Sequence, residues 1–134
     1  IKKEEEKKIL VKMRKLLKNS DVIIVADYGH GMMTPAVIHQ LTNKARFLAV
    51  NTQANAGNRG FNTISKYPKA DYVCLNGSEV QLEMRMKRTS FKELIIDLHD
   101  QIICDKYTVT LGRAGSIHFE QSNGFVEAPA FAIL

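Results

Sequence analysis

Short runs of apolar residues recur along the chain and predict its strands. Residues 22–26 are nearly all apolar, which is typical of a strand buried on both faces of a parallel sheet. Residues 47–50 and 72–75 predict two further strands, and the β-branched stretch 107–111 predicts a fourth. Each run is followed at once by Asp, Asn or Gly, so polar loops are expected where these strands end.

Segments with apolar residues at helical spacing separate these strands. Residues 2–18 predict a first helix, and Thr34, followed by a proline, is the expected N-cap of a second. A third helix is expected to open where Ser78 and Gln81 satisfy the capping-box pattern, and a fourth to span residues 90–104. The residues expected to face the core are Ile9, Met13, Leu16, Leu17, Val37, Ile38, Leu41, Ala45, Leu94, Ile95, Leu98, Ile102 and Ile103.

The last part of the chain has the pattern of antiparallel strands. Residues 112–115 contain two glycines and predict a turn into a strand at 116–121, and Asn123-Gly124 predicts a second turn before the extended residues 125–131. Strands that alternate with helices favour a parallel sheet. The expected fold class is therefore α/β, with a mostly parallel sheet flanked by helices and an antiparallel edge. The 134 residues are expected to form a single domain.

Composition excludes several classes of protein. The chain is 45% hydrophobic, which is enough for a core. It contains no run of about 18 or more apolar residues, so no membrane span is expected. The start lacks a signal-peptide pattern, and the two cysteines lack C-x-x-C spacing. We therefore expect a reduced, cytoplasmic protein without a membrane partner.

The net charge of +5 raises the question of nucleic acid. Residues 1–18 hold eight Lys or Arg against three Glu, whereas the remainder holds eleven basic and eleven acidic residues. The excess therefore belongs to the first helix, which we interpret as a packed amphipathic helix with a solvated basic face. No aromatic residues are interleaved to stack on bases, so a nucleic-acid partner is not expected. Binding of nucleic acid through Lys8, Lys12 and Lys15 stays an alternative.

Four loops are expected at the carboxyl ends of the parallel strands, where α/β sheets bind ligands. They are residues 27–33, 51–60, 76–79 and 110–115. Each contains groups that can bind a polar molecule, so the sequence predicts one rim of candidate ligand-binding loops.

The first of these loops contains unusual residues for a simple turn. Asp27 offers a carboxylate at the strand end, and His30 offers a titratable donor. The flanking Gly29 and Gly31 let backbone approach a ligand, or supply positive φ. The alternative is a tight strand-to-helix turn in which Asp27 binds local amides, and this loop alone does not decide between the two.

The third and fourth loops carry weaker signals. The oxygens of Asn76 and Glu79 suit Mg²⁺ held partly through water, although Glu79 would equally suit a first helical turn. Thr110, Gly112 and Gly115 place a hydroxyl and two glycines at a strand end. Such a turn can cradle a nucleotide, and it is also an ordinary hairpin.

Taken in order, these loops resemble the ribokinase-like (PfkB) carbohydrate kinases. Residues 27–31 are similar to that family's Asp-Tyr-Gly-Lys-Gly stretch, and residues 50–53 stand where it has Val-Asp-Pro-Lys. Residues 76–79 match its Asn-x-x-Glu motif, and residues 110–115 match its Thr-x-Gly-x-x-Gly nucleotide loop. Residues 128–130 resemble the stretch that leads toward its Gly-Ala-Gly-Asp.

The resemblance implies an ATP-dependent kinase that transfers a γ-phosphoryl group to a hydroxyl of a sugar or sugar phosphate, with Mg²⁺ as a cofactor. It leaves open a homodimer or further domains of a parent chain. The residues that it assigns are Thr110, Gly112 and Gly115 to the nucleotide, Asn76 and Glu79 to Mg²⁺, and Asp27, Gly29, His30, Gly31, Asn51 and Gln53 to the sugar side.

Departures from the family pattern limit this expectation. The chain contains no Gly-x-Gly-Asp, so the catalytic aspartate is expected beyond Leu134 and no residue of the chain is assigned as catalytic. The glycine-rich sugar-binding start and the lid strands are also missing. We therefore expect a central fragment of a kinase domain that is inactive alone. His30 and Gln53 replace lysines, which leaves a nonenzymatic nucleotide or sugar sensor as an alternative. Residues 51–70 are most similar to kinase domains fused to sugar nucleotidyltransferases.

Overall fold

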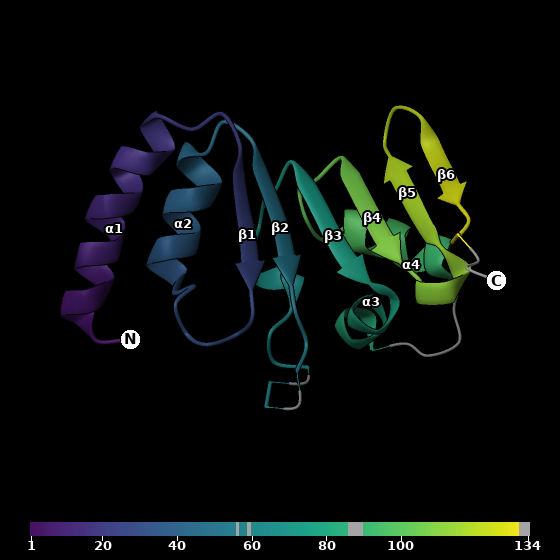
Figure 1. The fold of residues 1–134 in the computed structure, drawn as a ribbon, viewed down its shortest axis with the longest axis horizontal. Coiled ribbons are helices and arrows are strands. Elements are labelled where there is room, and N and C mark those ends of the chain that lie inside the picture. Colours follow the sequence, from purple (N-terminus) through teal and green to yellow (C-terminus); the bar gives the residue numbers. More distant parts are fainter. Residues whose placement is uncertain (56, 59, 86–89, 132–134) are drawn as a thin grey trace.

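Six strands of the described residues form one sheet whose spatial order follows the sequence (Figure 1). The structure, a computed structural model, describes residues 1–55, 57–58, 60–85 and 90–131. The first four strands run parallel, and the last two complete an antiparallel edge, so the predicted fold class is confirmed. The strands are β1 (Ile23–Asp27), β2 (Leu48–Thr52), β3 (Tyr72–Asn76), β4 (Lys106–Thr110), β5 (Ser116–Glu120) and β6 (Gly124–Ala128). The helices are α1 (Lys3–Lys18), α2 (Pro35–Lys44), α3 (Gly77–Met84) and α4 (Phe91–His99), with short 3₁₀ turns η1 (Ile64–Lys66) and η2 (Gly112–Ala114).

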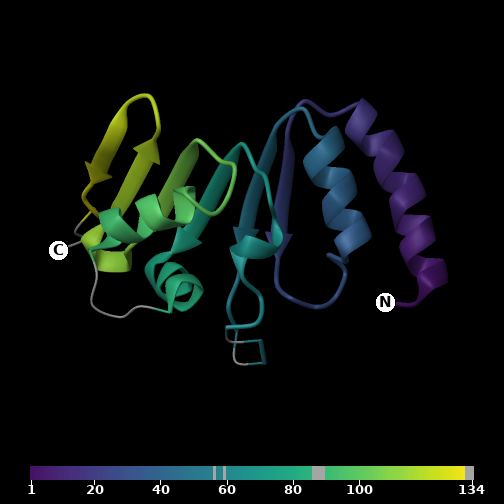
Figure 2. The same cartoon turned by 180° about the vertical axis from the view of Figure 1, so that it is seen from behind.

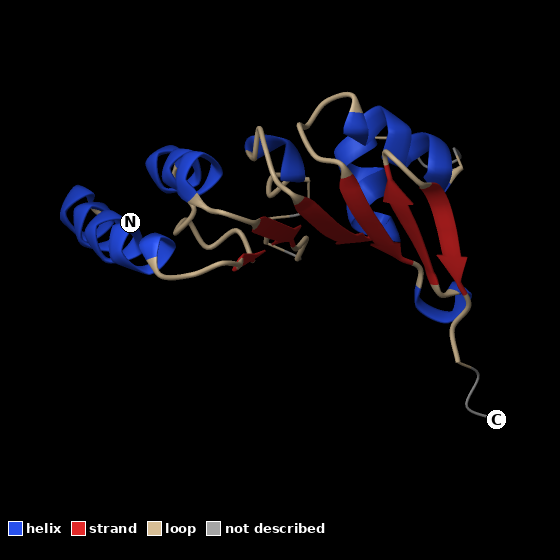
Figure 3. Cartoon of the chain, turned by 90° about the horizontal axis from the view of Figure 1, so that it is seen from above, coloured by secondary structure: helices blue, strands red, loops and turns tan. Residues whose placement is uncertain are grey.

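The helices lie on one side of the sheet (Figures 2 and 3). Right-handed crossovers between strands that neighbour one another in sequence order all place their connections on the same face. In β1, Val25 is 4% exposed and Asp27 is 3% exposed, whereas Ile24, which precedes Val25, is 77% exposed. The prediction that residues 22–26 are buried on both faces is therefore wrong, because no described helix covers the second face of this strand.

This one-sided burial predicts that substitution by threonine has unequal effects on stability at two adjacent positions of β1. Val25→Thr places a hydroxyl in the core and is expected to lower the free energy of unfolding by about 1–3 kcal/mol. Ile24→Thr keeps a β-branched side chain on the open face and is expected to change it by less than about 0.5 kcal/mol. Urea denaturation of both variants checks this, and an equal loss at the two positions would contradict it.

The helix α4 is shorter than the sequence pattern predicts. The expected core residue Leu98 is fully buried, but the helix ends at His99 and Ile103 is 71% exposed. The chain leaves the helix because the Ile103 N–H donates to the Pro68 carbonyl at 3.1 Å. The Ile103 carbonyl in turn accepts the Ala70 N–H at 3.0 Å. This backbone pairing turns the chain toward β4 and leaves the Ile103 side chain outside the core.

The helix α1 lies at the β1 end of the fold and packs against α2 (Figure 1). Leu17 is buried and Met13 packs against the core, but Leu16 is 62% exposed, contrary to the prediction. A helix with one neighbour buries only a narrow stripe, and Leu16 lies outside it.

No helix among the described residues is long and apolar enough to cross a membrane.

Candidate functional site

The carboxyl ends of the four parallel strands lie along one rim of the sheet, at its lower edge in Figure 1. The register pairs Asp27 with Thr52 across β1 and β2, and Asn76 with Thr110 across β3 and β4. Because parallel strands point the same way, the loops that follow them open at the same edge. The structure thus brings together the four loops that the sequence singles out.

The third loop begins a helix two residues earlier than predicted. Asn76 is the N-cap: its Oδ1 accepts the Glu79 N–H at 3.0 Å, and the Glu79 carboxylate accepts the Asn76 N–H at 2.9 Å. The capping box therefore consists of Asn76 and Glu79, and the predicted pair Ser78 and Gln81 is wrong. Ser78 instead donates its hydroxyl to Asn76 Oδ1 at 2.6 Å. Asparagine accepts the helix N–H at least as well as serine, which explains the earlier start.

Glu79 joins two loops of the rim. Its side chain is only 8% exposed, and its second oxygen accepts the Ala54 N–H from the loop after β2 at 3.1 Å. Among the described residues, no group of three or more His, Cys, Asp or Glu side chains could hold a metal ion. A single carboxylate beside the amide oxygen of Asn76 fits a Mg²⁺ ion held mainly by phosphate and water, as is usual for this ion.

A cavity of about 410 Å³ opens between the start of α3 and the loop after β4. Its lining residues are Asn76, Gly77, Ser78, Gln81, Phe91, Thr110, Leu111, Gly112 and Ala114. The Asn-x-x-Glu start and the glycine loop, which lie more than thirty positions apart in the sequence, therefore border one space. Thr110 is exposed at the end of β4, so its hydroxyl is free to meet a ligand.

The loop after β4 is also a tight structural turn. The Leu111 N–H donates to the Gly115 carbonyl at 2.7 Å, and the Gly115 N–H donates to the Gly112 carbonyl at 3.0 Å. Gly115 has φ +91, and a Cβ there would lie 2.0 Å from the Ala128 carbonyl oxygen. Gly112 also has positive φ but faces open space. Gly115 is thus required by packing against the end of β6, while Gly112 leaves the backbone beside the cavity uncovered.

Asp27 is the centre of a buried polar cluster at the end of β1. Its Oδ1 accepts the Gly29 N–H at 2.9 Å, and its Oδ2 accepts the Tyr67 hydroxyl at 2.7 Å and pairs with the Lys66 ammonium. Lys66 also donates to Asn62. This cluster ties η1 and Tyr67 to the loop after β1, so the carboxylate has a structural role whatever ligand lies beside it.

The pKa values in this cluster follow from the same contacts. Burial by itself raises the pKa of Asp27, but the hydrogen bonds from Lys66, Tyr67 and the Gly29 N–H, with the charge of Lys66, outweigh it and the pKa is lowered. Burial and the neighbouring Asp27 raise the pKa of Tyr67, so its hydroxyl stays protonated as a donor. The pair is therefore a stable anion and neutral donor at neutral pH.

The sequence analysis missed Asn62, Lys66 and Tyr67, which lie in a polar stretch without a clear period. Tyr67 is fully buried, and a buried tyrosine hydroxyl needs a partner. Tyr67 and the apolar Ile64, which is also buried, are the local signals that part of this stretch enters the core. Its partner, forty positions away, could not be identified from the pattern.

The glycines of the first loop have different roles. A Cβ at Gly29 would lie 2.3 Å from Asn58 Nδ2, so the side chain of Asn58 fills the space that a larger residue would need. The Asn55 and Asn58 side chains donate to the Tyr28 carbonyl at 3.1 and 2.8 Å. Gly31 has φ +81 and open space around it. The loop after β2 thus holds the first loop in place at Gly29 and leaves Gly31 uncovered.

The remaining predicted residues occupy the same end of the sheet. His30 is exposed and stacks on Tyr28 with ring centroids 6.3 Å apart. Asn51 lies on the open face of the sheet, where its side chain donates to the Cys74 carbonyl at 2.8 Å. The Gln53 carbonyl accepts the Asn62 side chain at 3.1 Å. The side chain of His30 is therefore the most accessible in this group.

Several solved structures share the fold of this chain. Escherichia coli phosphofructokinase-2 in complex with potassium superposes with a TM-score of 0.71 and 12% identity, over 93% of this chain and 42% of that chain. Arabidopsis thaliana ribokinase complexed with ribose and ATP superposes with a TM-score of 0.70 and 13% identity, over 90% of this chain and 38% of that chain. The chain has a ribokinase-like fold. The E. coli phosphofructokinase-2 in complex with fructose-6-phosphate superposes with a TM-score of 0.69 and 10% identity, over 100% of this chain and 45% of that chain.

The ribokinase-like chain spans less than half the length of these structures. No protein-family model and no curated protein sequence matches it. At identities of 13% or lower, the likeness confirms the predicted fold, and the reaction has to be argued from the site. The finer similarity of residues 51–70 to nucleotidyltransferase fusions stays a prediction, and residues 56 and 59 within it lie outside the described residues.

Proposed function

We propose that the chain is part of an ATP-dependent kinase that transfers the γ-phosphoryl group to a hydroxyl of a sugar or sugar phosphate. The observation that carries this proposal is the single rim, on which Asn76, Thr110 and Gly112 border one cavity. The loops after β1 and β2 continue the same edge. Structures with the same fold include a ribokinase complexed with ribose and ATP, which supports this class of reaction.

In this proposal, the nucleotide lies against the loop after β4. The Thr110 hydroxyl contacts the nucleotide, and the backbone around Gly112 and Gly115 lies beside it. When bound, Mg²⁺ neutralises charge on the phosphates. Asn76, which lines this cavity, would orient the ion's water ligands. Glu79 lines a separate small cavity with Thr52 and Ala54, so its proposed role toward the ion is to hold Asn76 in place through the capping box.

The sugar is proposed to lie at the β1 and β2 end of the rim. His30, with Gly29 and Gly31 on either side, would contact it, while Asp27 holds this loop in position. The remaining residues proposed for the sugar side are Asn51 and Gln53. Lys66 is 29% exposed and keeps a cation at this end, although His30 and Gln53 stand where the family has lysines. Such a cation suits a phosphorylated sugar.

Phosphoryl transfer also needs a base for the acceptor hydroxyl. Asp27 and Glu79 are the carboxylates of the rim loops, and both are nearly fully buried and already accept hydrogen bonds. Neither is proposed as the base. We therefore expect this chain alone to bind nucleotide without turnover. The free thiols Cys74 and Cys104 suit a reducing, cytoplasmic setting.

Titration calorimetry of the chain with MgATP tests the nucleotide site. Thr110→Val removes the hydroxyl at the cavity and is expected to weaken MgATP binding by about fivefold, the value of one hydrogen bond. Thr108→Val is the matched control, because Thr108 lies on the same face of β4 but one pleat away from the rim. MgATP binding that is absent from the wild type, or equally weakened in both variants, would contradict the proposed site.

A nonenzymatic sensor is the second candidate, and the full engagement of Asp27 and Glu79 in structural contacts favours it. The two readings differ in the complete protein. A kinase releases ADP when MgATP and an acceptor sugar are present, whereas a sensor binds the nucleotide without releasing ADP. Coupled measurement of ADP in the parent protein therefore decides between them, independently of the Thr110 result.

A further inference from the structure

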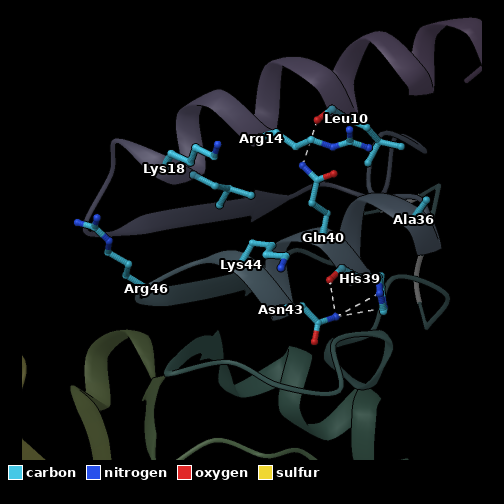
Figure 4. Close-up of a pocket in the computed structure, with 10 residues that line it drawn as sticks. Leu10, Arg14, Lys18, Ala36, His39, Gln40, Asn43, Lys44 and Arg46 are labelled. Atoms are coloured by element: carbon cyan, nitrogen blue, oxygen red, sulfur yellow. Dashed lines mark hydrogen bonds between the residues drawn. The ribbon is translucent and has the colours of Figure 1, made fainter.

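A second cavity lies outside the rim, between the parallel helices α1 and α2 (Figure 4). Its volume is about 800 Å³. The lining residues are Leu10, Arg14, Leu17, Lys18, Ala36, His39, Gln40, Asn43, Lys44 and Arg46. The two helices are joined across it by the Gln40 side chain, which donates to the Leu10 carbonyl at 3.1 Å. The groove is thus a fixed feature of the helix pair.

The walls and the floor of this groove differ in chemistry. Leu10, Leu17 and Ala36 contribute apolar surface, whereas the lining includes four Lys or Arg side chains and no Asp or Glu. Arg14 and Lys18 come from α1, and the other two cations come from α2 and the turn after it. Figure 4 shows the cations along both sides of the groove.

Three of these four cations form no ion pair with the described part of the chain, and the fourth forms only a surface pair. Arg14, Lys18 and Lys44 are exposed and form no ion pair with the described part of the chain. Arg46 pairs with Asp21 at 2.6 Å, but both side chains are largely exposed, and such surface pairs contribute little. An anionic partner therefore meets uncompensated charge on both walls.

We propose that this groove binds an acidic amphipathic helix of a partner protein. Apolar residues at helical spacing would pack on Leu10, Leu17 and Ala36, in the manner of a helix laid into a hydrophobic groove. Arg14 and Lys18 are four residues apart on one helix face, so glutamates at the same spacing on the partner can pair with both. Acidic residues on its other flank would meet Lys44 and Arg46.

The composition of the groove favours a peptide over nucleic acid. The lining contains no Phe, Tyr or Trp on which a base could stack, and its floor is apolar rather than a track for phosphates. Lys8, Lys12 and Lys15, the residues that a nucleic-acid surface on α1 would use, are exposed and lie outside the groove. The cations that line the groove and those that a nucleic acid would contact therefore lie on different faces of α1, and substitutions can test them separately.

Fluorescence anisotropy with a synthetic peptide tests the proposal. The probe is a labelled peptide of about four helical turns with leucines at i, i+3, i+4 and i+7 and glutamates on both flanks. Arg14→Glu/Lys18→Glu is expected to weaken its binding by about tenfold or more. Lys8→Glu/Lys12→Glu is the matched control, with the same helix, spacing and charge change, and is expected to weaken binding by less than about threefold.

Three results would overturn the proposal. Equal weakening of peptide binding by the two double variants indicates general charge attraction. Equal binding of a scrambled peptide of the same composition shows that the apolar residues of the groove do not contribute to binding. Displacement of the peptide by a duplex oligonucleotide, with steep salt dependence, indicates a nucleic-acid surface instead. Because glutamates near a helix C-terminus can destabilise it, Arg14→Gln/Lys18→Gln is measured in parallel and is expected to weaken binding in the same direction.

Discussion

Replacing Asp27 by alanine is expected to lower the free energy of unfolding by about 2–4 kcal/mol. The substitution leaves the Tyr67 hydroxyl without its acceptor and Lys66 beside a cavity without its counter-charge. The loss lies at the lower end of the range for a broken buried pair because Lys66 is 29% exposed and can recover some water. Chemical denaturation measures the change.

A surface ion pair of the same chemistry provides the control. Asp21 pairs with Arg46 at 2.6 Å, but its side chain is 88% exposed. Asp21→Ala is therefore expected to change the free energy of unfolding by less than about 1 kcal/mol. A loss at Asp27 no larger than the loss at Asp21 would show that the cluster at the end of β1 does not stabilise the fold.

Acid unfolding gives a second readout of the same prediction. The pKa of Asp27 is lowered from its ordinary value of 3.8, so the folded protein holds the ionised form more strongly than the unfolded chain does. The stabilisation is fully present above the unfolded pKa and is lost as the pH falls through the folded pKa. Asp27→Asn is expected to remove this part of the pH dependence, which lies below the unfolded pKa of 3.8.

Gly115→Ala is expected to separate the end of β6 from the loop after β4. A Cβ at this position would lie 2.0 Å from the Ala128 carbonyl oxygen and 2.8 Å from the Ala130 nitrogen, both backbone atoms that cannot move by rotating a side chain. The positive φ of +91 adds strain. We expect a loss of more than about 2 kcal/mol, with hydrogen exchange of β6 amides rising first.

Gly112→Ala tests whether the loop after β4 binds nucleotide independently of its packing against β6. Gly112 has φ +58 with nothing within 4 Å of the added Cβ, so only backbone strain of about 1 kcal/mol is expected. If the loop also binds nucleotide, Gly112→Ala should weaken MgATP binding while β6 keeps its protection from exchange. Loss of β6 protection in Gly112→Ala, or its retention in Gly115→Ala, would contradict this division of roles.

Local chemistry made much of the fold and the rim predictable. Apolar runs followed by Asp, Asn or Gly located the four parallel strands, and Thr34 before Pro35 located the start of α2, where its side chain accepts the Val37 N–H at 3.3 Å. Residues 112–115 were predicted as a turn into an antiparallel strand, and β5 pairs with β4 as expected. These features depend on neighbours within a few residues, which the sequence displays directly.

Features that depend on distant partners could not be predicted in this way. Ile24 and Val25 have similar side chains, and only the placement of the helices decides that one is exposed and the other buried. The end of α4 is likewise determined by backbone pairing between Ile103 and residues 68–70, more than thirty positions earlier in the chain.

The sequence by itself determined the order of strands and turns and the chemical groups at each strand end, because these follow from periodicity and backbone preference over short stretches. The tertiary structure alone decided how those groups are used. Asp27 is anchored by Lys66 and Tyr67, about forty positions along the chain, and Gly115 by the end of β6. Contacts between distant segments depend on how the whole chain folds back on itself, and the pattern of residues within a short stretch does not specify them.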